Sequence, residues 1–471
     1  MNNGALTSRI LTCLLLSAAL WLGYAGAGDQ RLFLVAAGAV AVVASGAFAY
    51  ARPGEAVVLA VVLVLVAGTK FRYRDIRSST EVDAQVIMEL ALYGTIAVLL
   101  GVAWLSKARG RIALTRMDLI LTAYVLFAIA STFWSSERPV TVVRSIQLVI
   151  LFLLAEALVR MLGPERALRV LGASLLAYVI ICTIAAVTIP GAGRGFRDYY
   201  GTYRFTWFVV HPISAAAAAG TALVFVSSEA LFLPGGWARR WFRVPLWLHG
   251  LVLFTIFLAT GSRAPAVALF VGTAALVLRR YGRAWTVPLL GAIVTAGVVA
   301  ISSGPTLLGL MRMGAASSNP IAEFVFRGQP LEEVEALSGR EALWKGAVTL
   351  FHERPLLGYG YQGARLHLVD ILGWGGHAHN AVMGTLLDVG VLGAALIWLP
   401  VGVCFFRCVV EGGRDPGVQS WSRAVLLGVV CFMLVNAIAD VSFAGTPSFD
   451  TLLMIGCILA QERLLNRSTT F

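Results

Sequence analysis

The sequence predicts an all-α integral membrane protein, a polytopic bundle of about 12 to 14 transmembrane helices. Of its 471 residues, 58% are hydrophobic and only 13% are charged, which excludes a water-soluble globular protein. Apolar runs of membrane-spanning length recur from end to end, since a bilayer core of about 30 Å needs about 20 helical residues. These runs are continuous and lack the alternation of barrel strands, so helices are the spanning elements.

The apolar runs define about fourteen candidate spans, and one re-entrant or tilted pair would reduce the count to about twelve. The first span follows Arg9 and ends in small residues, as a signal peptide does, but the many later spans favour an uncleaved helix. In chain order the expected spans are 10–25, 32–50, 55–69, 85–105, 117–133, 141–159, 166–188, 206–227, 245–260, 264–279, 285–302, 380–406, 422–440 and 446–462.

The formal charge of +12 comes almost entirely from arginine, and the basic residues set the orientation. Five basic loops fall on one side if the spans alternate, so that side is expected to be the cytoplasm, with both termini in it. The basic residues are scattered between apolar spans, and this distribution argues against a nucleic-acid partner. The five loops carry Lys107, Arg109, Arg111 and Arg116; Arg160, Arg166 and Arg169; Arg239, Arg240 and Arg243; Arg279, Arg280 and Arg283; and Arg407, Arg414 and Arg423.

This orientation divides the chain into four expected parts. Residues 1–244 form N-terminal transmembrane helices, and residues 245–302 form further ones around a turn at Arg263. Residues 303–379 form a large exterior loop with short helices, and residues 380–471 form the C-terminal transmembrane helices. The loop contains an apolar periodicity over 341–352 that predicts a short helix lying on the membrane surface and ending before Pro355.

Two exterior loops contradict the usual charge bias, because they are rich in arginine on the translocated side. Arginine suits phosphate, whose oxygens its planar fork grips in pairs, so these loops predict an anionic ligand. The alternative is pairing with acidic residues nearby in the chain. The cations concerned are Lys70, Arg72, Arg74 and Arg77 in one loop and Arg194, Arg197 and Arg204 in the other.

The turn Thr260-Gly261-Ser262-Arg263-Ala264-Pro265 joins two spans with almost no loop. Ser262 suits a helix N-cap and Pro265 the first turn, so Arg263 falls where backbone N–H groups point outward. An arginine there predicts a compact diphosphate site. The alternative is an arginine that reaches from the interface to water.

The end of the exterior loop reads Gly375-Gly376-His377-Ala378-His379-Asn380. A neutral histidine at a membrane interface takes a proton from a hydroxyl near neutral pH, and Asn380 is placed to orient the ring or the acceptor. The two histidines also resemble a metal pair, but the spacing to His367 and Asp370 matches no known ligand pattern, so no metal is expected. Arg340 is either a further site cation or a cap.

Other polar residues within the spans are candidates by position alone. His211 is expected to pack or to line a cavity. Glu89, Glu156 and Asp388 are functional candidates by default, and pairing with an arginine of another helix is the alternative for each.

Across about residues 245–440 the order of motifs resembles the O-antigen ligase and polymerase superfamily. The matching features are Gly261-Ser262-Arg263, then Ser338-Gly339-Arg340, Trp344 and Pro355-Leu356-Leu357-Gly358-Tyr359-Gly360 in a long exterior loop, and then His379-Asn380 followed by Gly390 and Gly393.

The resemblance implies a metal-independent, cofactor-free inverting glycosyltransferase with a GT-C-like multi-helix architecture, on the periplasmic face of the bacterial inner membrane. It would move O-antigen polysaccharide from undecaprenyl diphosphate to lipid A-core oligosaccharide, among membrane lipids, in lipopolysaccharide biosynthesis. His379 would be the general base, and Arg263 with an exterior arginine such as Arg194 would hold the diphosphate. Other residues expected to bind substrate are Arg197, Arg204, Lys70, Arg72, Arg74, Arg340, Asn380 and His377.

Two alternatives remain open from the sequence. One is an O-antigen polymerase or a protein O-oligosaccharyltransferase of the same superfamily, with like chemistry and a different acceptor. The other is a small-anion transporter, which also needs many spans and intramembrane arginines.

Overall fold

The computed structural model describes residues 43–70, 83–107, 114–189, 192, 196–197, 203–233, 245–281, 340–373, 376–410 and 418–468. Helices make up nearly all of the secondary structure in these ranges, so the all-α prediction is confirmed. The exception is a short antiparallel ladder of β1 (Phe196–Arg197) and β2 (Tyr203–Arg204), in which Phe196 is paired with Arg204. A ladder this short leaves no periodicity in the sequence from which to predict it.

The helices follow the hydrophobic pattern closely. Every expected span from 55 to 279 and from 380 to 462 overlaps a helix, because long apolar runs satisfy their backbone only in that form. The helices are α3 (Pro53–Ala67), α4 (Ala84–Lys107), α5 (Arg116–Ala130), η2 (Ser131–Phe133), α6 (Arg138–Leu162), α7 (Pro164–Thr188), α8 (Pro212–Phe232), α10 (Leu246–Ala259), α11 (Arg263–Tyr281), α16 (Arg340–Glu353), α17 (Arg365–Leu372), α18 (Ala381–Val410), α19 (Val418–Ala439), η5 (Ser442–Ala444) and α20 (Phe449–Ser468).

Eight of the described helices are long and apolar enough to cross a membrane, and α3 and α10 are shorter apolar helices. The chain is therefore a multi-pass membrane protein. The expected spans 10–25 and 285–302 lie outside the described residues, and residues 43–51, at the end of the span expected at 32–50, are helical. The span expected to start at 206 starts instead at Pro212, because β2 and a turn occupy residues 203–211.

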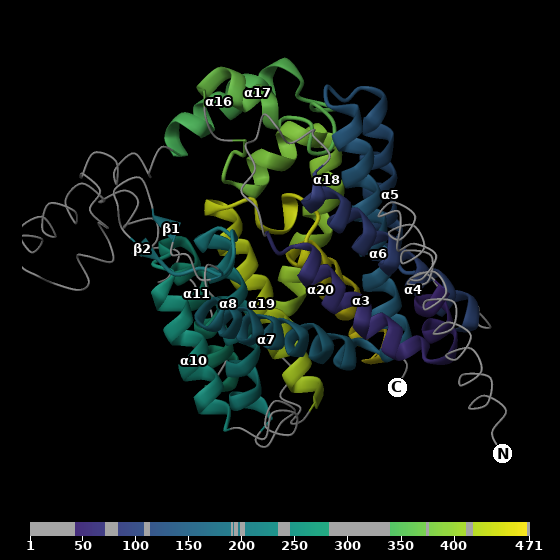
Figure 1. Ribbon diagram of the computed structural model, residues 1–471, viewed down its shortest axis with the longest axis vertical. Coiled ribbons are helices and arrows are strands. Elements are labelled where there is room, and N and C mark those ends of the chain that lie inside the picture. The colour runs from purple at the N-terminus through teal and green to yellow at the C-terminus, as the bar shows by residue number, and fades with distance from the viewer. Residues whose placement is uncertain are drawn as a thin grey trace, which may run out of the picture.

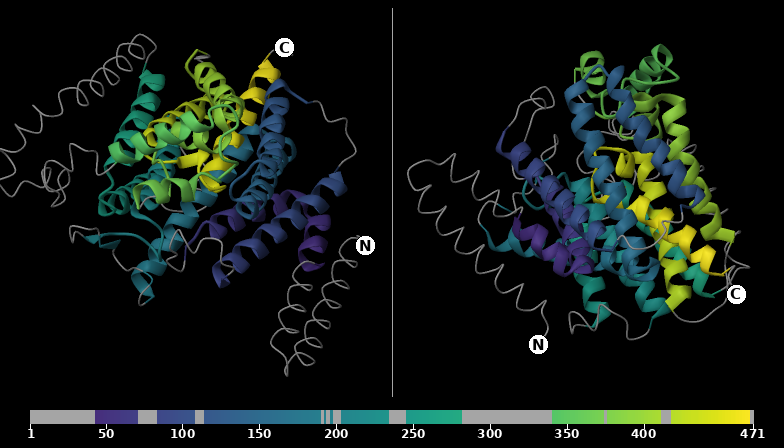
Figure 2. Two further views of the ribbon diagram at one scale, coloured as in Figure 1. Left: turned by 90° about the horizontal axis from the view of Figure 1, so that it is seen from above. Right: turned by 90° about the vertical axis from the view of Figure 1, so that its right-hand side faces the viewer.

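The helices form two neighbouring groups that meet where α19 contacts α18 and α20 (Figure 1). One group packs α8 and α11 against α19, with α10 against α8, and the other packs α5, α6 and α18 around α20. In both Figure 1 and the right view of Figure 2, α16 and α17 cover one end of the bundle. Large apolar side chains remain exposed on outer faces, for example Leu126 and Phe270, as expected for a surface that contacts lipid.

The segment that follows α16 packs against a break inside α18. Gly390 has φ of 63°, and a Cβ on it would lie 2.2 Å from the Leu356 carbonyl oxygen. The freed backbone groups are satisfied there, since Val391 N donates to Pro355 O and Tyr359 N donates to Leu387 O, both at 2.9 Å. The glycine thus lets another segment of backbone pair with the helix.

The same segment also contacts the η2 turn between α5 and α6. Trp134 Nε1 donates to Leu357 O at 3.0 Å, and Tyr361 N donates to Ser131 Oγ at 2.9 Å. Inside, the buried Asp388 accepts from Gln362 Nε2 at 3.1 Å and from Ala364 N at 3.2 Å. The Pro-Leu-Leu-Gly-Tyr-Gly motif is therefore a joint between α16, α18 and the α5–α6 turn.

Two carboxylates inside the bundle pair with arginines, which was the structural alternative for them. Glu89 of α4 accepts from Arg144 of α6 at 2.5 Å. Glu156 of α6 lies 2.5 Å from Arg160 and 2.8 Å from Arg463 of α20. Because an uncompensated buried charge is costly, these pairs fix the helices relative to one another.

Candidate functional site

The turn between α10 and α11 is held by a buried arginine from β2. Arg204 Nε donates to Thr260 O at 2.8 Å, and its Nη2 donates to Ser262 Oγ at 2.5 Å. Ser262 Oγ in turn donates to Pro212 O at 3.2 Å, which brings the start of α8 to the same turn. The turn is tight because Gly261 has φ of 58°, a conformation that a side chain disfavours.

Arg263 is the first residue of α11, as the sequence predicts. The Arg204 guanidinium, Ser262 and the amino end of α11 together give this corner a positive character. A site for an anion such as a diphosphate is the chemistry that such a corner supports.

A second set of contacts fixes the loop that carries His379. Trp344 Nε1 of α16 donates to Ala378 O at 3.0 Å. Asn380 Oδ1 accepts from Met383 N at 3.0 Å, which caps α18, and its Nδ2 donates to Ile438 O at 3.1 Å near the end of α19. The Asn380 side chain thus bonds backbone groups and anchors the loop. Between these anchors His379 takes φ of 47°, which is unusual for a residue with a side chain.

His379 faces a carboxylate that the sequence analysis did not single out. Its Nδ1 lies 3.7 Å from Asp440 Oδ1, with side-chain exposures of 34% for His379 and 16% for Asp440. Asp440 Oδ1 also accepts from Val441 N at 2.9 Å, which fixes the carboxylate. In the sequence Asp440 is the last residue of the span expected at 422–440. An acidic residue at the exterior end of a span was the signal that could have identified it as a candidate site residue.

His211 lies next to the first set of contacts, because it precedes Pro212, whose carbonyl oxygen accepts from Ser262 Oγ. Burial and the cations Arg204 and Arg340, with His379, lower the pKa of His211 to about 4, while Asp440 acts in the opposite direction. His211 therefore lies within electrostatic reach of groups from β2, α16, the loop before α18 and the end of α19. This juxtaposition joins residues that are far apart in the chain.

Lys70 lies near this end of the bundle. Its carbonyl oxygen accepts from Val209 N at 2.9 Å, two residues before His211. Arg197 belongs to β1, which pairs with the strand that ends in Arg204. The other predicted cations, Arg72, Arg74 and Arg194, lie outside the described residues, as does Arg77.

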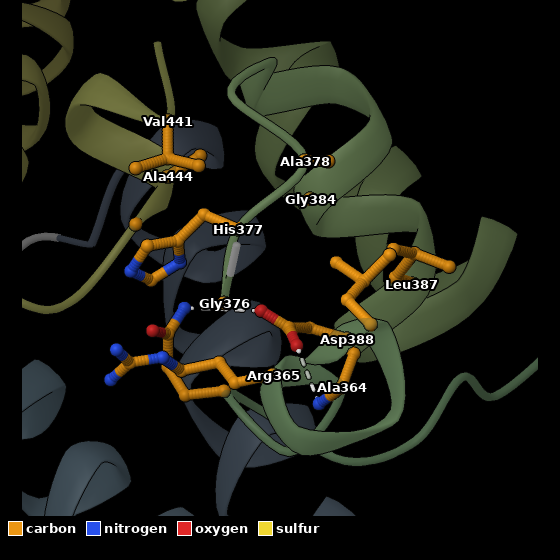
Figure 3. Close-up of a pocket in the computed structure, with 13 residues that line it drawn as sticks. Ala364, Arg365, Gly376, His377, Ala378, Gly384, Leu387, Asp388, Val441 and Ala444 are labelled. Atoms are coloured by element: carbon orange, nitrogen blue, oxygen red, sulfur yellow. Dashed lines mark hydrogen bonds between the residues drawn. The ribbon is translucent and has the colours of Figure 1, made fainter. Parts of the chain in front are cut away.

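His377 lies in a different setting from His379. It lines a small cavity of about 20 Å³ together with Arg365 and Asp388. Figure 3 shows its ring beside Val441 and Ala444, with the Arg365 guanidinium below it. Burial, and next the Arg365 charge, lower the pKa of His377 well below its ordinary value. A cavity of this size beside a neutral ring holds about one water molecule and is too small for a sugar.

Among the described residues, no group of three or more His, Cys, Asp or Glu side chains is arranged to hold a metal ion. The arrangement instead offers an imidazole, a carboxylate beside it and several guanidinium groups. Such a set can accept a proton at one point and stabilise an anion at another.

Comparison with known proteins locates a family domain over this region. No curated protein matches the chain. Residues 248–398 match the family model described as O-antigen ligase, an interval that includes the Arg263 turn, α16, α17, His379 and the Gly390 break. The resemblance predicted from the motifs is thereby confirmed for this region. The superfamily consists of glycosyltransferase-like enzymes that handle polysaccharide and lipid substrates in membranes. Residues 248–398 of this chain are similar to the O-antigen ligase family.

Proposed function

We propose that the protein is an O-antigen ligase that transfers polysaccharide from undecaprenyl diphosphate to the lipid A-core oligosaccharide. Two observations support the proposal: His379 Nδ1 lies 3.7 Å from Asp440, and Arg204 holds the turn at Ser262 and Arg263, while His211 is within electrostatic reach of Arg204, His379 and Asp440. The base that removes the proton and the cations that bind the departing diphosphate must lie within the length of one substrate. This arrangement supports both steps. A metal-independent inverting transfer is the reaction that fits.

In this proposal His379 is the general base. With Nδ1 toward Asp440, Nε2 takes the proton of the acceptor hydroxyl, and the hydroxyl oxygen attacks the anomeric carbon of the donor sugar. The bond from that carbon to the diphosphate oxygen breaks, and its electron pair leaves with the diphosphate. Attack opposite the leaving group inverts the configuration. Asp440 stabilises the imidazolium that forms, as carboxylates do for catalytic histidines.

In the proposed reaction the cations stabilise the leaving group. Negative charge grows on the diphosphate as the glycosidic bond breaks, and fixed guanidinium groups in a partly dry site stabilise that charge without reorganisation. Arg263 and Arg340 are the proposed diphosphate contacts, and Arg204 holds the turn that presents Arg263. Lys70, Arg72, Arg74, Arg194 and Arg197 are proposed to add to the positive field.

The proposed orientation places this end of the bundle in the periplasm of a bacterium, with both termini in the cytoplasm. The five basic loops support it, because cytoplasmic loops of inner-membrane proteins carry the excess of arginine and lysine. The donor then keeps its tail in the bilayer and its diphosphate at the interface. Both lipid substrates reach the site from within the membrane.

The test uses the purified full chain in lipid nanodiscs with an undecaprenyl-diphosphate-linked glycan. Three acceptors are supplied separately: lipid A-core, a second lipid-linked glycan, and a peptide with serine and threonine hydroxyls. The proposal expects product on lipid A-core alone, lost in His379→Ala and kept in the control His352→Ala, whose ring lies on the exposed side of α16. Lengthened lipid-linked glycan would indicate a polymerase, glycopeptide would indicate a protein oligosaccharyltransferase, and each would overturn the ligase assignment.

A further inference from the structure

We propose that the segment Pro355-Leu356-Leu357, between α16 and α17, is an interfacial anchor that inserts into the membrane leaflet on the side of the candidate site. Its two leucine side chains contact acyl chains, and the guanidinium groups of Arg138 and Arg354 bind lipid phosphates. The proposed partner is the bilayer itself, with anionic phospholipid at its surface. The inference does not depend on which glycan or acceptor the enzyme uses.

Large apolar side chains at this end of the bundle are exposed. Phe133 in η2 is 83% exposed, Leu356 is 62% exposed and Leu357 is 41% exposed. They lie together, because Trp134, next to Phe133, donates from Nε1 to Leu357 O at 3.0 Å. Contact with water would cost about 25 cal/mol for each Å² of this apolar area. A contiguous exposed patch of this kind marks an interaction surface.

The patch continues two stripes of exposed apolar residues on the transmembrane helices. On α5 and on α18, large apolar residues are exposed at every seventh position, about two turns apart, and so share one face of each helix. The stripes are Leu119, Leu126 and Phe133 on α5, and Leu392, Leu399 and Phe406 on α18. The α5 stripe ends in the patch, at Phe133. The α18 stripe ends at the interfacial anchor, since Leu392 N donates to Leu356 O at 3.3 Å. The surface that contacts lipid therefore extends onto this segment.

The length of the α5 span places the patch at the edge of the hydrocarbon. The span Arg116–Phe133 has 18 residues. At 1.5 Å per residue it extends about 27 Å, close to the hydrocarbon thickness of about 30 Å. Arg116 belongs to one of the basic loops, so Phe133 lies at the opposite membrane surface. Trp134 beside it is of a residue type that is enriched at membrane interfaces.

The apolar face of α16, by contrast, packs within the protein. Leu343, Ala347 and Leu350 are buried, and the helix contacts α17 and α18. Its outer face carries Glu341 and Lys345, which form an ion pair at 2.6 Å. The part of this region that presents exposed leucines is therefore the segment after α16.

Two arginines flank the leucines. Arg138, at the start of α6, donates from Nη2 to Phe133 O at 3.5 Å. The Arg354 guanidinium lies 4.8 Å from the centre of the Tyr359 ring. Both arginines are exposed. Guanidinium groups at the edge of an apolar patch suit lipid phosphates, whose oxygens they grip in pairs, and are attracted to an anionic membrane surface.

The interfacial anchor is connected to the loop that carries His379. Tyr359, at the end of the same motif, packs in one buried cluster with Ala378, the residue before His379. Insertion of the leucines thus sets the depth of this loop relative to the bilayer.

The test is photo-crosslinking of the full chain in nanodiscs of phosphatidylglycerol and phosphatidylcholine in equal parts. The photoreactive residue p-benzoylphenylalanine replaces Leu356, or Leu126 as the lipid-exposed control, or Lys345 on the outer face of α16 as the water-exposed control. Lipid adducts are quantified by mass spectrometry after illumination. We expect the yield at Leu356 to be within about threefold of the yield at Leu126 and at least about tenfold above that at Lys345.

A second measurement tests the arginines. The ratio of phosphatidylglycerol to phosphatidylcholine adducts at Leu356 is compared between the otherwise wild-type chain and a chain with Arg138→Gln and Arg354→Gln. We expect phosphatidylglycerol to be enriched by about threefold or more, and the double substitution to abolish the enrichment. At Leu126 the ratio should be the same in both chains, because that position lies within the hydrocarbon.

Three results would overturn the proposal. A yield at Leu356 as low as that at Lys345 would show that the leucines lie in water. Crosslinks from Leu356 to a second copy of the chain, in place of lipid adducts, would show a protein interface. An adduct ratio at Leu356 that the double substitution leaves unchanged would show that the arginines do not bind the headgroups.

Discussion

Asp440→Asn removes a negative charge from the neighbour of the proposed base and keeps its size. The asparagine carbonyl can still accept from Val441 N, which Asp440 Oδ1 does now, so the turn into η5 is expected to persist. What is lost is the attraction between the carboxylate and the imidazolium that forms on His379 as it takes the acceptor proton. The variant therefore tests electrostatics at the site with little change in packing.

The distance sets the magnitude. Two unit charges 3.7 Å apart attract by about 1 kcal/mol in water and by about 4 kcal/mol at an effective dielectric constant of 20. His379 is 34% exposed and Asp440 16%, so the surroundings are intermediate between these limits. At about 1.4 kcal/mol for each tenfold change in rate, we expect kcat to fall by about 10-fold to 1,000-fold. Binding of the donor should change little, because the charge on His379 develops only during the reaction.

The assay is transfer of glycan to lipid A-core in nanodiscs, with kcat and donor affinity measured for each variant. Asp370→Asn, at an exposed position on α17, is the matched control and should behave like the wild type. A kcat within threefold of the wild type would refute the pairing of His379 with Asp440.

Three further predictions concern the framework. Gly390→Ala should lower the free energy of unfolding by about 2 kcal/mol or more, because a Cβ would meet the segment after α16 at a positive φ. Gly402→Ala in the same helix, where a Cβ meets no described atom within 4 Å, should be as stable as the wild type, and equal stability of the two variants would contradict this. Trp344→Phe removes the hydrogen bond to Ala378 O and should reduce kcat several-fold, with at most about 1.5 kcal/mol of destabilisation. The control Trp247→Phe, at an exposed position, should leave kcat unchanged. An unchanged kcat in Trp344→Phe would show that this hydrogen bond is dispensable. Glu156→Gln should destabilise the bundle by about 1.5 kcal/mol or more in thermal unfolding, because Arg160 and Arg463 lose one of their two carboxylates and keep only Asp118; wild-type stability would mean that Glu156 contributes nothing net.

The helices were predictable because hydrophobic run length determines where a chain can cross lipid, and that quantity is local. The Arg263 turn was predictable for a similar reason, since Ser262 and Pro265 signal a helix start within a few residues. The break in α18 was not, because Gly390 reads as a small residue in an apolar run until the Leu356 carbonyl is placed against it.

The pairing across the site depends on contacts distant in the chain. His379 and Asp440 are separated by α18 and α19, and Arg204 reaches the α10–α11 turn across α8 and α10. The sequence placed Arg204 among exterior cations, but its hydrogen bonds to Thr260 and Ser262 follow only from the fold. His211 was expected to pack or to line a cavity, and its electrostatic neighbours come from four separate elements.

In the proposed mechanism, one site holds a general base and a set of diphosphate-binding cations, and the two have separate roles. The most direct measurement compares His379→Ala and Arg263→Gln, each for single-turnover transfer and for equilibrium binding of undecaprenyl diphosphate in nanodiscs. We predict that His379→Ala loses transfer by at least about 100-fold with donor affinity within threefold of the wild type, and that Arg263→Gln loses donor affinity by about tenfold or more. Near-normal transfer by His379→Ala, or wild-type donor affinity in Arg263→Gln, would contradict the account.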